Sequence, residues 1–196
     1  NDWSARDIQS WEYQPLGPFL AKSFATSISP WIVTAEALAP FRKSVAERSS
    51  GDPAPLPHLF DAEDQDSGAL SIEIDALLLT QRMRQENAEP VKLSRSNSEN
   101  LYWSPAQMVS HHTSNGSHLV NGDVMGSGTI SGPQDDALGS LLEITRGAKQ
   151  AFTLPNGEQR KFLEDGDEVT LLGRCHRDGY KSIGFGTCCA LITPAS

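Results

Sequence analysis

Turn-forming dipeptides recur along this sequence and constrain its fold more than any other feature. Six of them pair a glycine with Asn, Asp or Pro: Asn115-Gly116, Asn121-Gly122, Gly132-Pro133, Asn156-Gly157, Asp165-Gly166 and Asp178-Gly179. Glycine adopts the left-handed backbone conformation that tight turns require, and Asn and Asp tolerate it. Turns this frequent indicate that the chain folds into short strands that reverse direction often.

The clearest strand is predicted at residues 70–78, where apolar residues at every second position alternate with Ser71, Glu73 and Asp75. This alternation gives the strand one buried face and one wetter face. Further candidate strands cover residues 28–33, 124–130, 141–145, 169–174 and 183–192. Ladders at this spacing predict a mainly β, α+β fold, arranged as a mixed sandwich, roll or barrel.

Helix signals are sparse, and the best of them lies at residues 104–112. Ser104 can cap this helix, with Pro at the first helical position and Gln three residues after the cap to complete a capping box. A further helical turn is expected after Thr34. Residues 43–67 show no periodic pattern of apolar residues and contain several prolines, so we predict an exposed loop there.

Charge and composition exclude several classes of protein. Twenty-five acidic against sixteen basic residues leave a net charge of −9, the wrong sign for binding a phosphate backbone, so no nucleic-acid partner is expected. No stretch approaches the roughly 20 apolar residues that span a bilayer, so no membrane partner is expected either. The three cysteines are an odd number, which suits a reducing, cytoplasmic compartment better than a disulfide framework.

The first thirteen residues are dense in side chains of the kind that line sites. They contain two Trp, three acids, an Arg, a Gln and a Tyr, and the first residue is Asn. A chain of 196 residues is expected to be one domain, and we expect this one to begin inside a domain, with part of its chemistry in an upstream segment.

A shared helix face is the first candidate site. If residues 1–13 are helical, Asp2, Arg6, Gln9 and Tyr13 follow a spacing of three to four and lie on one side. They could then present a carboxylate, a cation and two hydrogen-bonding groups to one pocket. An amphipathic helix with an ordinary surface Asp–Arg pair explains the same pattern, so both interpretations stay open.

Three further positions could carry chemistry. Lys22 lies among apolar residues after a turn, where it could stabilise negative charge or simply extend its ammonium group to water. Glu143 lies in the apolar run 141–144, which we expect to be buried, so its carboxylate needs a partner, such as a histidine or cation outside this chain. Thr129 could project a hydroxyl into a pocket from a strand end.

The sequence also holds blocks that are too long to recur by chance. They cover residues 1–9, 12–13, 15–20, 22–24, 29–31, 127–133 and 162–168, with shorter blocks at 111–112, 115–116, 178–180 and 183–186. Together these blocks resemble the fumarylacetoacetase family, nearly from end to end. The resemblance implies a mixed β-sandwich roll, with residues 1–196 forming the C-terminal portion of one catalytic domain whose upstream part lies outside this chain.

The resemblance also implies an activity. Members of this family use a divalent ion, Mg²⁺ or Ca²⁺, to hydrolyse a carbon–carbon bond of the diketo acid 4-fumarylacetoacetate, giving fumarate and acetoacetate in the last step of tyrosine catabolism. A cytoplasmic homodimer is implied as well. Two alternatives stay open: a β-roll that serves only as a dimerisation or binding module, and a related decarboxylase or hydratase of oxo acids.

The resemblance implies roles for several residues at the metal ion and at the negative charge that develops during the reaction. Asp2 would be a carboxylate ligand of the ion, with Lys22 and Thr26 in its outer shell. Lys22 would also stabilise charge on the leaving acetoacetate, and Arg6 would support the oxyanion. Glu143 would orient a water-activating histidine, which, like the other three acidic ligands, is expected upstream.

The remaining implied roles concern the substrate. Gln9 and Tyr13 would hydrogen-bond to it, and Thr129 would lie near its carboxylate. The neighbouring His111 and His112 diverge by about 100° on a helix, which argues against a zinc cluster, and they are expected to be structural.

Overall fold

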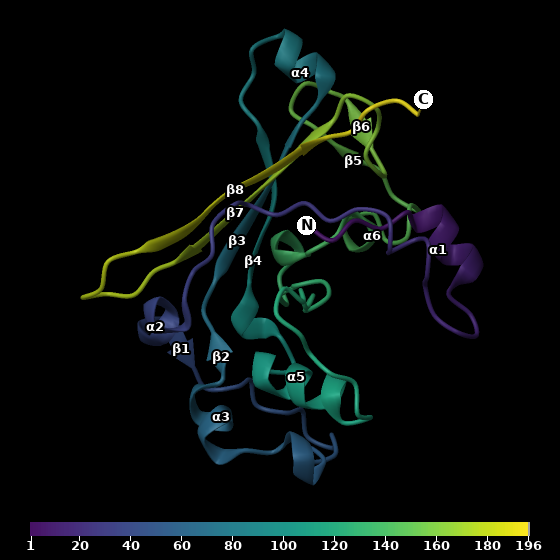
Figure 1. The fold of residues 1–196 in the computed structure, drawn as a ribbon. Coiled ribbons are helices and arrows are strands. Elements are labelled where there is room, and N and C mark those ends of the chain that lie inside the picture. Colours follow the sequence, from purple (N-terminus) through teal and green to yellow (C-terminus); the bar gives the residue numbers. More distant parts are fainter. Residues whose placement is uncertain (196) are drawn as a thin grey trace.

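A four-stranded antiparallel sheet in the order β4-β3-β7-β8 is the centre of the fold. The structure is a computed structural model that describes residues 1–195, so the last residue of the predicted 1–196 unit lies outside the described residues. The strands are β3 (Glu73–Leu79), β4 (Val91–Asn97), β7 (Glu168–Cys175) and β8 (Ile183–Leu191). Figure 1 shows the β7–β8 hairpin projecting well beyond the other strands.

Three of the predicted strands are confirmed in this sheet. The alternating segment at 70–78 supplies β3, and the segments at 169–174 and 183–192 supply β7 and β8. On β3, Leu78 is fully buried and packs with Met83 and Leu154, which form the core at one end of the sheet. Burial of these side chains fixes the register, because a slip of one residue would turn Leu78 toward solvent.

Within residues 1–195, two small sheets and six short helices surround the central sheet. β1 (Arg42–Lys43) pairs with β2 (Ala69–Leu70), and β5 (Phe152–Thr153) pairs with β6 (Gln159–Arg160). The helices are α1 (Arg6–Glu12), α2 (Ala35–Leu38), α3 (Ala62–Ser67), α4 (Gln81–Gln85), α5 (Pro105–Thr113) and α6 (Leu141–Ile144). Single 3₁₀ turns cover Ala39–Phe41, Pro57–Leu59, Ser98–Asn100 and Asp135–Ala137.

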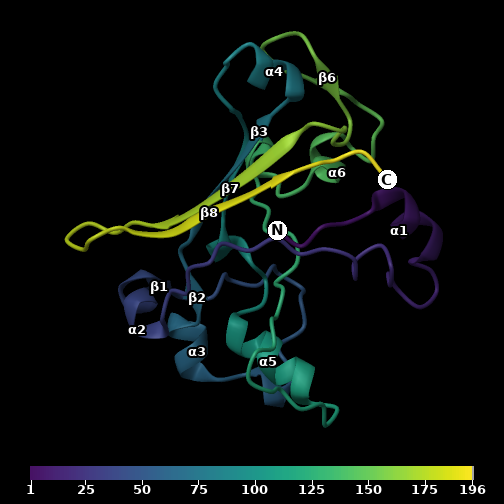
Figure 2. The same ribbon diagram turned by 45° about the horizontal axis from the view of Figure 1, so that its top comes forward.

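This architecture confirms the predicted α+β class with few short helices. Within residues 1–195 the sheets are antiparallel and none closes into a barrel. Figure 2 shows the helices in separate groups around the sheet: α4 with β6 near one end, α2, α3 and α5 near the other, and α1 on a projecting arm. No helix in the described part of the chain is long and apolar enough to cross a membrane.

Two predicted helix starts are confirmed by their caps. The Ser104 side chain accepts a hydrogen bond from the Gln107 backbone N–H, and the Gln107 side chain accepts one from the Ser104 backbone N–H, which completes the capping box of α5. The Thr34 hydroxyl caps α2 in the same way, by accepting from the Ala37 N–H.

The predicted strands at 28–33 and 124–130 are wrong, because neither segment pairs its backbone with a strand. Segment 28–33 runs beside β8 and is held there by a side chain: Ser29 Oγ donates to the Phe185 carbonyl at 2.5 Å. Segment 124–130 is exposed over nearly its whole length. Apolar alternation stabilises a strand only where a sheet edge is available to pair with it.

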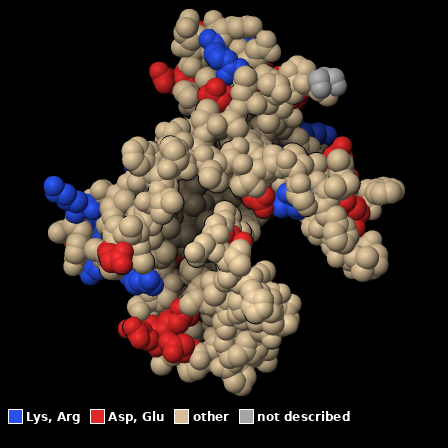
Figure 3. Space-filling model, viewed as in Figure 1, with Lys and Arg blue, Asp and Glu red and all other residues tan. Residues whose placement is uncertain are grey.

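The predicted strand at 141–145 is also wrong, since residues 141–144 form α6 and Thr145 is its C-terminal cap residue. The Ser140 side chain caps this helix by accepting from the Glu143 N–H. Its run is half-buried, which corrects the expectation that it is largely buried. The predicted loop at 43–67 is wrong in part, because Asp61 caps α3 within it. Figure 3 shows acidic side chains gathered over this helix, where Glu63 and Asp64 occupy the first turn.

Candidate functional site

Two extended segments near the amino terminus bring Asp2, Lys22 and Thr26 together. An isolated antiparallel bridge pairs Asp2 with Thr26, and the Thr26 hydroxyl donates to Asp2 Oδ1 at 3.3 Å. Lys22 Nζ lies 3.1 Å from Asp2 Oδ2. The ammonium group also donates to the Asp2 carbonyl at 3.0 Å and to Ser4 Oγ at 2.9 Å. Lys22 is therefore held at the Asp2 carboxylate by several contacts and does not extend freely into water.

Helix α1 carries the next pair of predicted residues. Arg6 Nη1 donates to Gln9 Oε1 at 2.8 Å, an interaction that the spacing of three residues allows. Tyr13 is the C-terminal cap residue of this helix and is half-exposed. The predicted helix face is wrong for Asp2, because α1 begins only at Arg6 and Asp2 lies in the extended bridge.

The loop that contains Thr129 approaches the Asp2 carboxylate. A Cβ placed on Gly126 would lie 3.9 Å from Asp2 Oδ2. Further along, a Cβ placed on Gly139 would lie 2.3 Å from the Ile130 carbonyl and 2.7 Å from the Thr129 methyl group, so only glycine fits there. The close approach of Gly139 fixes the end of this loop, and Thr129 itself is exposed.

Glu143 has hydroxyl partners on both of its carboxylate oxygens. Ser131 Oγ donates to Oε1 at 2.8 Å, and Ser140 Oγ donates to Oε2 at 2.7 Å. The Gly139 N–H donates to Ser131 Oγ at 3.0 Å, which orients the Ser131 hydroxyl. The expected need for a partner is thus met within this chain, in addition to any group that approaches from outside it.

Two residues of this site were not predicted from the sequence. Ser4 supplies an oxygen for Lys22, and the Glu12 carboxylate accepts two backbone N–H groups of the turn that precedes Lys22. These N–H groups, with Ala21 contributing most, hold the pKa of the Glu12 carboxyl below its usual value. Because the partners of Glu12 are backbone groups, no pattern of side chains in the sequence indicates them.

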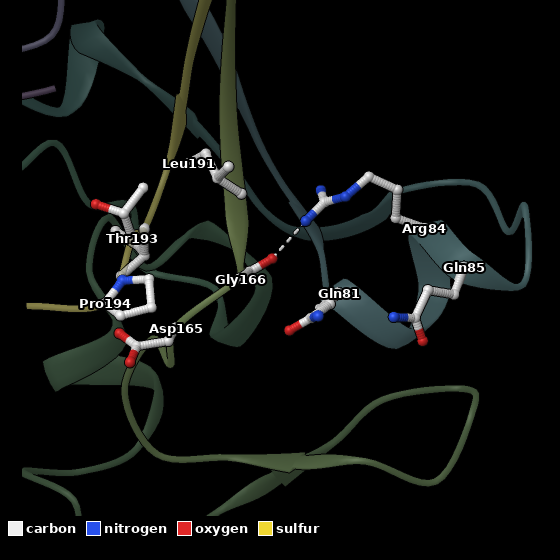
Figure 4. Close-up of a pocket in the computed structure, with 9 residues that line it drawn as sticks. Gln81, Arg84, Gln85, Asp165, Gly166, Leu191, Thr193 and Pro194 are labelled. Atoms are coloured by element: carbon white, nitrogen blue, oxygen red, sulfur yellow. Dashed lines mark hydrogen bonds between the residues drawn. The ribbon is translucent and has the colours of Figure 1, made fainter.

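One pocket of the described structure lies away from all of these residues. It has a volume of about 490 Å³ and lies between α4 and the end of β8. In Figure 4, Arg84 and Gln81 line one side of it, Thr193 and Pro194 line the other, and Arg84 donates to the Gly166 carbonyl at 2.6 Å. The predicted site is thus open surface along the amino-terminal segments, not this pocket.

The donor atoms at Asp2 suit a hard cation. A carboxylate and a hydroxyl are the oxygen ligands that Mg²⁺ and Ca²⁺ prefer. Within residues 1–195, however, no group of three or more His, Cys, Asp or Glu side chains could hold a metal ion. The described residues therefore fit one side of such a site and provide only part of a coordination shell.

Comparison with known proteins shows the family to which this chain belongs. Residues 1–192 match the family model described as Fumarylacetoacetate (FAA) hydrolase C-terminal. The chain belongs to this family. FAA hydrolase relatives similar to the whole chain include fumarylacetoacetases of Arabidopsis thaliana (49% identical over 195 residues), Bos taurus (48% over 195) and Homo sapiens (45% over 195).

These matches confirm the resemblance to the fumarylacetoacetase family that the sequence blocks indicated. Each covers all of this chain and 44% of the relative, so the chain spans less than half the length of the curated relatives it matches. The family model is that of a C-terminal portion.

Proposed function

We propose that the protein containing these residues is a metal-dependent hydrolase that splits 4-fumarylacetoacetate into fumarate and acetoacetate. The observation that carries the proposal is the contact of Lys22 with the Asp2 carboxylate beside Thr26. This contact places a carboxylate that can bind a hard cation next to a positively charged ammonium group. The resemblance assigns Asp2 to the metal ion and Lys22 to the leaving acetoacetate. The relatives named fumarylacetoacetase support the substrate.

Asp2 would hold the divalent ion. The Thr26 hydroxyl donates a hydrogen bond to Oδ1 of the same carboxylate. When bound, the ion polarises the diketone of the substrate and offsets negative charge. Since no three His, Cys, Asp or Glu side chains within residues 1–195 come together to hold a metal ion, we propose that the remaining acidic ligands come from a segment outside the sequence described here.

The reaction adds the oxygen of water to a carbonyl carbon and breaks the adjacent carbon–carbon bond. The electron pair of that bond goes to the acetoacetate carbon, which then takes up a proton. Lys22 and Arg6 would stabilise the negative charge that develops, because fixed cations that face such charge need no reorganisation during the reaction. Gln9 and Tyr13 would orient the substrate, and Thr129 would bind its carboxylate.

Glu143 would act through a histidine outside this chain. A carboxylate held by Ser131 and Ser140 has a fixed direction, and a fixed carboxylate orients an imidazole that removes a proton from water. We also propose that the ion is Mg²⁺ or Ca²⁺. The same proposal makes the protein a cytoplasmic homodimer that acts in tyrosine catabolism.

The test uses the full-length protein with 4-fumarylacetoacetate. Fumarate and acetoacetate are quantified by NMR with Mg²⁺, with Ca²⁺ and after chelation with EDTA. We expect equimolar products with metal and none after chelation. Glu143→Gln is expected to lower turnover at least 100-fold, as removal of a general-base component does.

Glu36→Gln is the matched control, because this carboxylate lies in the first turn of α2 and hydrogen-bonds to its own backbone and to Thr34. It should leave turnover unchanged. A metal-loaded protein that releases neither product would overturn the proposal and favour the binding module. Release of carbon dioxide would favour the decarboxylase.

A further inference from the structure

The Glu12 carboxylate joins the end of α1 to the turn that precedes Lys22. Its Oε1 atom accepts a hydrogen bond from the Phe19 backbone N–H at 2.7 Å and another from the Ala21 N–H at 2.8 Å. One side-chain oxygen thus binds two backbone donors seven and nine residues later in the chain. Bonds from N–H groups to an ionised carboxylate are roughly twice as strong as neutral ones.

The same turn is held from its other side. Ala21 is fully buried, and its carbonyl accepts from the Ala5 backbone N–H at 2.9 Å. Ala5 immediately precedes α1, so both ends of the helix contact the turn. The backbone at Ala21 is therefore fixed between the first residue before the helix and the last residue within it.

Lys22 follows this fixed backbone directly. Its ammonium group reaches the Asp2 carboxylate at 3.1 Å and Ser4 Oγ at 2.9 Å. A lysine side chain reaches only as far as its four-carbon stem allows, so these simultaneous contacts require its Cα to lie within that reach. Displacement of the turn would move the ammonium group away from Asp2 and Ser4.

We propose that Glu12 is a positioning residue: it fixes the turn so that the Lys22 ammonium is held against Asp2 and Ser4. The part of this inference that concerns catalysis rests on the proposed function. The part that concerns the placement of Lys22 does not.

The experiment compares full-length wild-type protein with Glu12→Gln, Glu12→Ala and the control Glu36→Gln. The Gln variant keeps an acceptor oxygen but loses the charge, and the Ala variant loses both. Three kinds of quantity are measured: deuterium uptake of peptides spanning residues 14–23, the rate at which Lys22 is methylated by formaldehyde and borohydride, and the steady-state constants kcat and KM.

We expect deuterium uptake and Lys22 methylation to be about tenfold faster in Glu12→Ala and less accelerated in Glu12→Gln. A displacement of about 1 Å can cost roughly 100-fold in rate, so kcat should fall by that order in Glu12→Ala, with KM changed less than about threefold. Glu36→Gln should match wild type in all of these quantities. A merely structural role would lower the melting temperature without this separation of kcat from KM.

The two proposals fail in different ways. A wild-type protein without turnover overturns the proposed function, while uptake and methylation still test the placement of Lys22. Unchanged methylation in the Glu12 variants overturns the positioning role. An unchanged kcat in a variant whose Lys22 is methylated faster overturns its catalytic part. If Glu12→Ala does not fold, Glu12→Gln decides each of these points.

Discussion

At the scale of single residues, the contacts of Lys22 define what its charge can do. Its ammonium group is bound to Asp2 and Ser4, and these contacts orient it. A preoriented cation acts mainly on charge that appears in the transition state.

Replacement of Lys22 by Met in the full-length protein tests this role. We expect kcat to fall about 100- to 1,000-fold with KM within about threefold, since the lost interaction belongs to the transition state. Steady-state kinetics with 4-fumarylacetoacetate measure both quantities. A normal kcat with a large rise in KM would make Lys22 a substrate clamp instead.

The resemblance placed Asp2, Lys22 and Thr26 near one another, but the sequence did not predict the contacts through which these three residues meet. Asp2 and Lys22 are twenty residues apart, and only the motif resemblance linked them. The residue spacing suggested a helix face for Asp2, but the bridge to Thr26 keeps it extended. Glu12 was noticed only as part of a motif, because its partners are backbone N–H groups that every residue except proline has.

At the scale of elements, α6 shows how a short apolar run can be misassigned. A run of four apolar and acidic residues fits a strand or one turn of helix equally well. The deciding signal was Ser140 followed three residues later by Glu143, a capping-box spacing. By contrast, α5 was predicted correctly, because the same kind of signal was recognised at Ser104.

Replacement of Ser140 by Ala should therefore affect both the helix and Glu143. Loss of an N-cap costs about 1 kcal/mol of stability, and the Glu143 carboxylate also loses one of its hydroxyl donors. Urea unfolding of the full-length protein measures the first effect, and kcat measures the second. Ser140→Thr keeps the hydroxyl and should restore both, so a threonine variant as impaired as the alanine variant would contradict this account.

A cluster of charged and polar groups joins α4 to the β5–β6 hairpin. Arg160 binds the buried Asp167 carboxylate through two bonds of 2.9 and 3.0 Å and also contacts Glu158 at 3.2 Å. The Thr80 hydroxyl, which caps α4, donates to Glu158 and is the main cause of the lowered pKa of that carboxyl.

This lowered pKa predicts a dependence of stability on pH. A carboxyl whose folded pKa lies below its unfolded value of 4.5 stabilises the protein fully above that pH. The contribution is lost as the pH falls through the folded value. We expect Thr80→Val to lose less stability than wild type between pH 7 and pH 3, while Thr80→Ser behaves as wild type. Urea unfolding at each pH measures this, and parallel curves for all three proteins would contradict it.

At the scale of the whole molecule, the solvent-accessible surface is larger than that of a compact protein of the same mass. The chain exposes 12992 Å², whereas a compact protein of 21.3 kDa exposes roughly 9,000 Å². Part of the excess is apolar, since Trp11, Trp31 and Ile32 are 88%, 69% and 93% exposed. The class of fold could be predicted from strand periods and turns, but this open shape could not, because sequence patterns do not reveal how elements are spread in space.

The excess surface leads to a prediction about residues 1–196 produced alone. Exposed apolar surface of this extent drives association, so we expect the isolated chain to self-associate at micromolar concentrations and to bind the dye ANS, unlike the full-length protein. We also expect weak binding of Mg²⁺, because within residues 1–195 no three His, Cys, Asp or Glu side chains come together to hold a metal ion. Light scattering, ANS fluorescence and isothermal titration compare the two proteins. A monomeric isolated chain that binds Mg²⁺ as tightly as the full-length protein would show that the missing ligands are among these residues after all.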